Sequence, residues 1–299
     1  QTTKKALATV RWGVTLSKGY EVVMTKQDYP NMIHAWKQKE MRDGISIKWL
    51  SFKLPIESED EFVKSFVDAS TPKTRIWHIT HMINWTGQIL PVKKLCEEAR
   101  KRNIISIVDG SHTFAHLDFK IPYFSPDYFG TSLHKWLCAP FGTGMLYVKR
   151  ENIAGLWPLF PNDKPRGNDI RKFEALGTRS FAPEQAIGQA IEFHLAIGSK
   201  RKQERLHYLK KYWCEKVITH PRIKLNVSLN PEFSCALGNF SIDGIEPGTI
   251  ASKLFAEHQI HTSPIVWENI SGVRITPHVY TLTRDLDRLV EAILKIASS

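Results

Sequence analysis

The sequence predicts an α/β fold in which helices cover both faces of a mainly parallel sheet. Short apolar segments of strand length alternate with longer segments of helical periodicity. Such alternation is typical of a parallel sheet built from strand–helix–strand units. A length of 299 residues suits one large domain and a smaller one. We expect a large domain over 1–182, a linking helix over 183–217 and a small C-terminal α+β domain over 218–299.

The individual elements follow from their periodicity and from turn residues at their ends. In the large domain, helices are predicted at 3–12, 32–42, 59–67 and 92–102, and strands at 21–25, 46–52, 75–79, 104–108, 128–133 and 144–148. Residues 157–172 are rich in proline, glycine and charge, which predicts a loop at the surface or at an interface. Beyond it we predict one continuous helix over 183–216, a strand over 234–240, and helices over 248–258 and 286–297.

Composition narrows the class of protein. The apolar fraction of 42% and the charged fraction of 24% are ordinary for a soluble globular chain. No apolar run approaches the roughly 18 to 20 residues that cross a bilayer, and the first residues do not resemble a signal peptide. A cytoplasmic location is expected, without a membrane partner. The four cysteines share no metal-ligand or disulfide spacing, so no metal site is expected.

A net charge of +11 raises the alternative of a basic binding protein. The basic residues are scattered, apart from Lys200–Lys202 and Lys210–Lys211 on one predicted helix. A solvated helix face explains these clusters better than a nucleic-acid site does, so no nucleic-acid partner is expected. A positive field also favours anionic cofactors and substrates.

Two predicted strands end at chemically reactive residues. Asp109 ends the strand over 104–108, and Lys135 follows the strand over 128–133. Open α/β sheets place their sites outside the carboxyl ends of strands, so these side chains are candidates for one shared site. A desolvated lysine has a lowered pKa and forms a Schiff base with an aldehyde. A buried aspartate nearby holds a pyridine nitrogen protonated.

These residues carry a resemblance to a known family. Asp109-Gly110-Ser111-His112, followed by Ser132-Leu133-His134-Lys135-Trp136, is similar to the cofactor signature of the class V aminotransferase family. The resemblance covers nearly the whole chain. It implies the fold-type I architecture, pyridoxal 5′-phosphate (PLP) as cofactor, an amino-acid substrate, and Lys135 and Asp109 as the catalytic residues. Relatives usually carry several dozen residues before this point, so we expect the N-terminal segment to be incomplete.

The resemblance also implies further cofactor contacts. Thr2 or Thr3 would bind the phosphate at the start of the first helix, although which of the two is left open. Tyr29 would lie against the ring. Asn84 would donate to the ring's phenolate oxygen. The remaining implied cofactor contacts are His112 near that oxygen, and Ser132 and His134 at the phosphate.

Two later segments complete the implied site. Gly177-Thr178 matches a family segment that reaches the neighbouring subunit's phosphate, which implies a homodimer with shared sites. Arg274, in Arg-Ile-Thr-Pro-His-Val-Tyr, would hold the substrate α-carboxylate through its bidentate fork.

The reaction is less closely defined than the cofactor. The sequence of these motifs is most similar to isopenicillin-N-epimerase-like proteins, a group that also includes C–S lyases. Aminotransferase activity is the alternative. A cysteine desulfurase needs a nucleophilic cysteine on a loop shortly before the carboxylate-binding arginine, and Ser263–Gly272 contains none.

Overall fold

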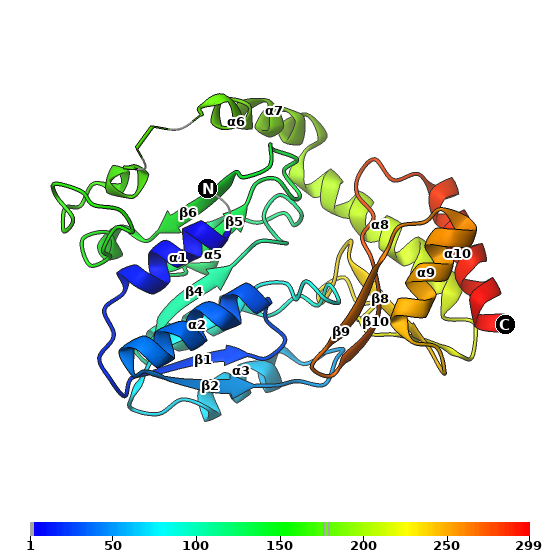
Figure 1. The fold of residues 1–299 in the computed structure, drawn as a ribbon, viewed down its shortest axis with the longest axis horizontal. Helices are drawn as coiled ribbons and strands as arrows, with labels where there is room; N and C mark the ends of the chain where they lie inside the picture. The colour runs from blue at the N-terminus through cyan, green and yellow to red at the C-terminus, as the bar shows by residue number, and fades with distance from the viewer. Residues whose placement is uncertain (1–2, 176, 179) are drawn as a thin grey trace.

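The computed structural model describes residues 3–175, 177–178 and 180–299, and its larger part is built on a six-stranded sheet (Figure 1). All neighbouring strands in this sheet pair in parallel except β5 and β6, which are antiparallel. In spatial order the strands are β2 (Ser46–Leu50), β1 (Glu21–Thr25), β3 (Thr74–Thr80), β4 (Ile105–Asp109), β5 (Tyr128–Ser132) and β6 (Gly144–Val148).

Helices cover both faces of this sheet. Consecutive strand residues point to opposite faces, and Val22 packs in one apolar core whereas Val23 packs in the other. The first core lies under α1 (Thr3–Gly13) and α2 (Pro30–Asp43). The second lies under α3 (Glu59–Asp68), α4 (Val92–Lys101) and the short α5 (Ile121–Phe124).

A smaller antiparallel sheet forms the C-terminal part. Its strands, in spatial order, are β7 (Ile223–Leu225), β8 (Gly238–Ile242), β10 (Ile270–Ile275) and β9 (Ser263–Trp267). Its apolar core is shared with α8 (Ser199–Val217), α9 (Pro247–His258) and α10 (Thr283–Ser298). Figure 1 shows α8 running from the large sheet to this C-terminal part. The predicted fold class is confirmed.

Two predicted elements differ from the structure. The single helix predicted over 183–216 is divided into α6 (Ala182–Gln185), α7 (Ile187–Ile197) and α8. The break before α8 lies at Gly198, whose φ of +87° is outside the helical region. The strand predicted over 234–240 begins only at Gly238, because the preceding residues contact the large sheet's loops instead. The loop before α6 contains the 3₁₀ turns η1 (Arg150–Asn152) and η2 (Ile170–Glu174).

Hydrogen bonds join the two sheets. The main-chain N–H of Ala236, just before β8, donates to Nε2 of His116 at 3.0 Å. Nδ2 of Asn239 donates to the carbonyl of Trp85 at 3.0 Å. The C-terminal part is therefore attached to the loops at the carboxyl ends of β3 and β4. Within the part of the chain that the structure describes, no helix combines the length and apolarity needed to cross a membrane.

Candidate active site

A pocket opens at the carboxyl ends of the central strands. In the paired register, Thr80 lies beside Asp109, and Asp109 lies beside Gly130 of β5. Parallel pairing therefore brings the ends of β3, β4 and β5 to one edge. The cavity there has a volume of about 220 Å³. The predicted residues that line it are Thr3, Tyr29, Asn84, Asp109, His112, Ser132, His134 and Lys135.

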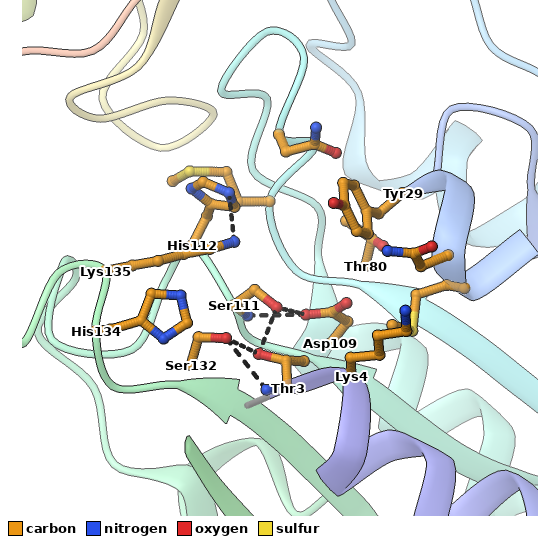
Figure 2. A pocket seen from close by; sticks show the side chains of 14 residues that line it. Thr3, Lys4, Tyr29, Thr80, Asp109, Ser111, His112, Ser132, His134 and Lys135 are labelled. Carbon is orange, nitrogen blue, oxygen red and sulfur yellow. Dashed lines mark hydrogen bonds between the residues drawn. The ribbon is translucent and has the colours of Figure 1, made fainter. Parts of the chain in front are cut away.

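Three hydroxyl groups meet at the start of α1. Thr3 Oγ1 lies 2.6 Å from Ser132 Oγ, and the Thr3 main-chain N–H donates to the same oxygen at 3.1 Å. Ser111 Oγ lies 2.9 Å from Thr3 Oγ1 (Figure 2). Hydroxyls at a helix N-terminus are suited to a phosphate group, because N–H donors and the helix dipole favour an anion there. Thr2, the other predicted phosphate ligand, lies outside the described residues.

Asp109 is held on one side only. The Ser111 main-chain N–H donates to Oδ1 at 2.9 Å, and the Ser111 hydroxyl donates to the same oxygen. Among the described residues no hydrogen bond reaches Oδ2, and the side chain borders the cavity. One carboxylate oxygen therefore remains for a donor inside the pocket, as a protonated pyridine nitrogen would be.

Lys135 and His112 are in contact in the cavity wall. The Nζ of Lys135 lies 2.9 Å from Nε2 of His112 (Figure 2). Burial, with a smaller contribution from the Arg274 cation, lowers the pKa of Lys135 to about 8, and the Asp109 carboxylate opposes this shift. A lysine with such a pKa has a substantial free-amine fraction near neutral pH, as a nucleophile or proton acceptor requires.

A buried charged group under the pocket was not foreseen from the sequence. Asp28 accepts from the Thr80 hydroxyl at 2.6 Å and from the Tyr29 N–H at 2.7 Å, so it orders two residues of the pocket wall. Burial and the nearby Asp109 charge raise the pKa of Asp28 to about 7. Arg11, 2% exposed, has its pKa lowered to about 10 by burial, while both carboxylates oppose this shift.

The opposite wall carries Tyr29 and Asn84. Tyr29 is 43% exposed and lines the cavity, and its ring lies 6.3 Å from that of Trp85. Figure 2 shows Tyr29 across the cavity from Lys135. This is a suitable place for an aromatic ring that stacks on a flat ligand. Asn84, 7% exposed, also lines the cavity.

Arg274 lies beside this pocket on β10. One terminal nitrogen donates to the main-chain carbonyl of Asn84 at 2.9 Å, and the other donates to Ser263 Oγ at 3.3 Å. Burial lowers the pKa of Arg274. Its positive charge also lowers the pKa values of Lys135 and His112.

The remaining predicted site residues lie apart from this pocket. Gly177 and Thr178 are exposed, and neither lines the cavity within the part of the chain that the structure describes. Sequence reasoning missed the roles of Ser111 and Thr80. Both could have been found, because each polar side chain ends or directly follows a strand whose end forms the site.

Comparison with known proteins places the chain in a family. The model of the class-V aminotransferase family matches residues 1–264. The chain belongs to the class-V aminotransferase family. It is 27% identical to isopenicillin N epimerase of Amycolatopsis lactamdurans over 94% of this chain and 75% of that protein. It is 29% identical to isopenicillin N epimerase of Streptomyces clavuligerus over 91% of this chain and 73% of that protein.

A solved structure shares the fold. A mutant of C-DES, described with glycine covalently linked to its PLP cofactor, superimposes with a TM-score of 0.87 at 18% identity. The superposition covers 98% of this chain and 78% of C-DES. C-DES is described elsewhere as a cystine C–S lyase. The expected family, fold and PLP-dependent enzyme class are confirmed.

Proposed function

We propose that this PLP-dependent enzyme acts at Cα or Cβ of an amino acid, as an epimerase or a C–S lyase. The observation that carries the proposal is the shared pocket of Lys135 and Asp109, with Arg274 beside it. An amine of lowered pKa, a carboxylate with an available oxygen and a carboxylate-binding cation are the groups this chemistry needs.

The described residues fit the cofactor. The hydroxyls of Thr3, Ser132 and Ser111 would hold its phosphate, with His134 at the same end of the cavity. Asp109 would bind the ring nitrogen, and Tyr29 would cover a ring face. When bound through Lys135, PLP supplies an electron sink for the charge that develops at Cα.

The side chains of the pocket have separate roles in the reaction. Lys135 accepts the proton from Cα and returns it, because its amine is partly unprotonated near neutral pH. Arg274 binds the α-carboxylate and so orients the Cα–H bond, at the edge of the pocket where Asn84 fixes its guanidinium. Asn84 and His112, which line the cavity, would contact the phenolate oxygen of the cofactor.

The choice between reactions rests on relatives. Two similar curated proteins are named isopenicillin N epimerase, and the structurally similar C-DES is described as a C–S lyase. Aminotransferase activity is the second candidate, on the family's name. Desulfurase chemistry is less favoured, because Ser263–Gly272, which spans all of β9 and the first three residues of β10, contains no cysteine.

The test combines spectroscopy with product analysis. The purified protein should show a visible PLP absorbance band that shifts on addition of an amino acid. Borohydride reduction and peptide mapping should label Lys135, and a label on another lysine would refute its role. Cα hydrogen exchange with deuterium alone indicates an epimerase, pyruvate with a thiol indicates a lyase, and stoichiometric pyridoxamine phosphate indicates an aminotransferase.

We also propose a homodimer with shared sites. Helix α7 is apolar, yet Ala190 is its only buried residue within the described chain. Ile191, Phe193 and Leu195 are 43%, 50% and 67% exposed. An apolar helix surface of this kind suits an interface between copies. Gly177 and Thr178, in the exposed segment before α6, would serve the partner's phosphate site.

The dimer has a direct test in solution. Leu195→Asp should shift the molar mass measured by light scattering from two chains to one and should reduce turnover. Val266→Asp is the matched control, because Val266 is an exposed apolar residue of β9 on the C-terminal sheet. A wild-type protein that is monomeric at micromolar concentration would refute this part.

Four free cysteines suit the reducing cytoplasm, which we propose as the location.

A further inference from the structure

Trp136 is held between two imidazole rings and contacts a third. Its indole ring stacks on His116, with ring centroids 3.8 Å apart, and on His278, with centroids 5.2 Å apart and an interplanar angle of 10°. Its Nε1 donates to Nδ1 of His112 at 3.4 Å. Trp136 is 3% exposed. Stacking and burial therefore fix the orientation of the Trp136 indole, and its only polar hydrogen is directed to His112.

The stacking partner His116 is itself fixed. Its Nδ1 lies 2.7 Å from the main-chain carbonyl of His112, which can only accept a hydrogen bond. Its Nε2 accepts from the main-chain N–H of Ala236 at 3.0 Å. One ring nitrogen thus donates and the other accepts, which is the pattern of a neutral imidazole. Burial lowers the pKa of His116 to about 3. This support for Trp136 stays uncharged across the neutral pH range.

The indole determines where His112 carries its proton. An indole N–H is a donor and never an acceptor. Because Trp136 donates to Nδ1 of His112, that nitrogen is unprotonated, and the neutral ring carries its proton on Nε2. Nε2 lies 2.9 Å from Nζ of Lys135. A protonated ring nitrogen cannot accept from an ammonium group, so this hydrogen bond forms when Lys135 is the free amine.

We propose that Trp136 is a positioning residue that selects the Nε2–H tautomer of His112, so that this imidazole donates to the free amine of Lys135. Burial, the Lys135 charge and the Arg274 charge lower the pKa of His112 well below its usual value, which agrees with a neutral ring. Burial likewise lowers the pKa of Lys135 to about 8. In the loaded enzyme the same N–H is available to the phenolate oxygen, a consequence that rests on the proposed function.

The opposite tautomer would have the opposite effect on Lys135. With its proton on Nδ1, His112 would accept from the Lys135 ammonium through Nε2 and stabilise the charged form. Removing the indole N–H removes the preference between the two tautomers. Trp136→Phe keeps a stacking ring between His116 and His278 but has no donor. It should therefore raise the pKa of Lys135.

The experiment uses the cofactor-free protein, so that it does not depend on PLP chemistry. Two-bond ¹H–¹⁵N correlation spectra of ¹⁵N-histidine protein identify the tautomer, and a His112→Gln variant assigns the signals. Competitive labelling of Lys135 with an amine reagent across pH, followed by peptide mass analysis, gives its titration midpoint. We expect Nε2–H in the wild type. In Trp136→Phe we expect signals of both His112 tautomers. We also expect the titration midpoint of Lys135 to rise by about one pH unit, so that labelling of Lys135 at pH values below the midpoint falls about tenfold.

Trp213→Phe is the matched control, because this buried indole in the C-terminal core has no hydrogen-bond partner among the described residues. It should leave both readouts unchanged. A wild-type His112 that is protonated on Nδ1 overturns the proposal, and so does a Trp136→Phe variant with unchanged tautomer and midpoint. If Trp136→Phe does not fold, the wild-type spectrum alone decides. A protein that never binds PLP would refute the proposed function and leave these readouts intact.

Discussion

The guanidinium of Arg274 donates to the main-chain carbonyl of Asn84 at 2.9 Å, across the junction between the C-terminal sheet and the loop after β3. The group assigned to the substrate carboxylate is thus oriented by the loop that also lines the cofactor pocket.

Arg274→Lys should weaken amino-acid binding by about 1.5 to 3 kcal/mol and leave PLP affinity unchanged, because an ammonium cannot make a bidentate contact. Titration of the visible band with amino acid measures this loss. Arg284→Lys, an exposed change in α10, is the control and should bind as the wild type does. Equal affinity in Arg274→Lys would remove Arg274 from the substrate site.

Asp109→Asn should retain the fold and reduce turnover by orders of magnitude, since a neutral amide cannot keep a pyridine nitrogen protonated. Steady-state kinetics measure the rate, and circular dichroism tests the fold. The exposed carboxyl of Asp118 provides a control variant, Asp118→Asn, with normal turnover. Turnover of Asp109→Asn near the wild-type rate would contradict the assignment.

Thr3→Ala should weaken PLP binding about tenfold, because each lost hydrogen bond to a charged group costs about 1.5 kcal/mol. Equilibrium dialysis of PLP measures the change. Thr9→Ala is a control on the same helix, since the Thr9 hydroxyl donates to the carbonyl of Lys5, one turn earlier. If both variants bind PLP equally, Thr3 is not a phosphate ligand.

Asp28→Asn should change how stability depends on pH. Burial and Asp109 raise the pKa of Asp28 from 3.8 to about 7 in the folded state. Between these values the folded protein holds a proton that the unfolded chain has released, so wild-type stability falls as pH rises. Below pH 4 the effect is absent, and above pH 7 it is complete.

The Asn variant has no carboxyl group to titrate, so its free energy of unfolding should not show this fall. Between pH 4 and pH 7 its stability relative to wild type should rise by on the order of 3 kcal/mol. Urea unfolding at several pH values measures the difference. Asp68→Asn, at an exposed site paired with Lys64, should follow the wild-type slope. A constant difference between Asp28→Asn and wild type would show that Asp28 does not titrate in this range.

Local patterns in the sequence predicted the strands and the residues at their ends. Asp109 and Lys135 were assigned to one site because parallel strands deliver their carboxyl ends to one edge. The contact of Arg274 with Asn84 joins segments far apart in the chain, and no local pattern encodes it. The burial of Arg11 could not be predicted from the sequence either, because a charged residue in an amphipathic helix is normally expected on the solvent face of the helix.

The ring of His116 also bears on how the molecule unfolds. It bonds the carbonyl of His112 in the large part and the amide of Ala236 in the C-terminal part. Separation of the two parts would leave these buried groups without hydrogen-bond partners. Each such group costs about 1 to 3 kcal/mol of folding free energy. We therefore expect that unfolding of either sheet destabilises the other.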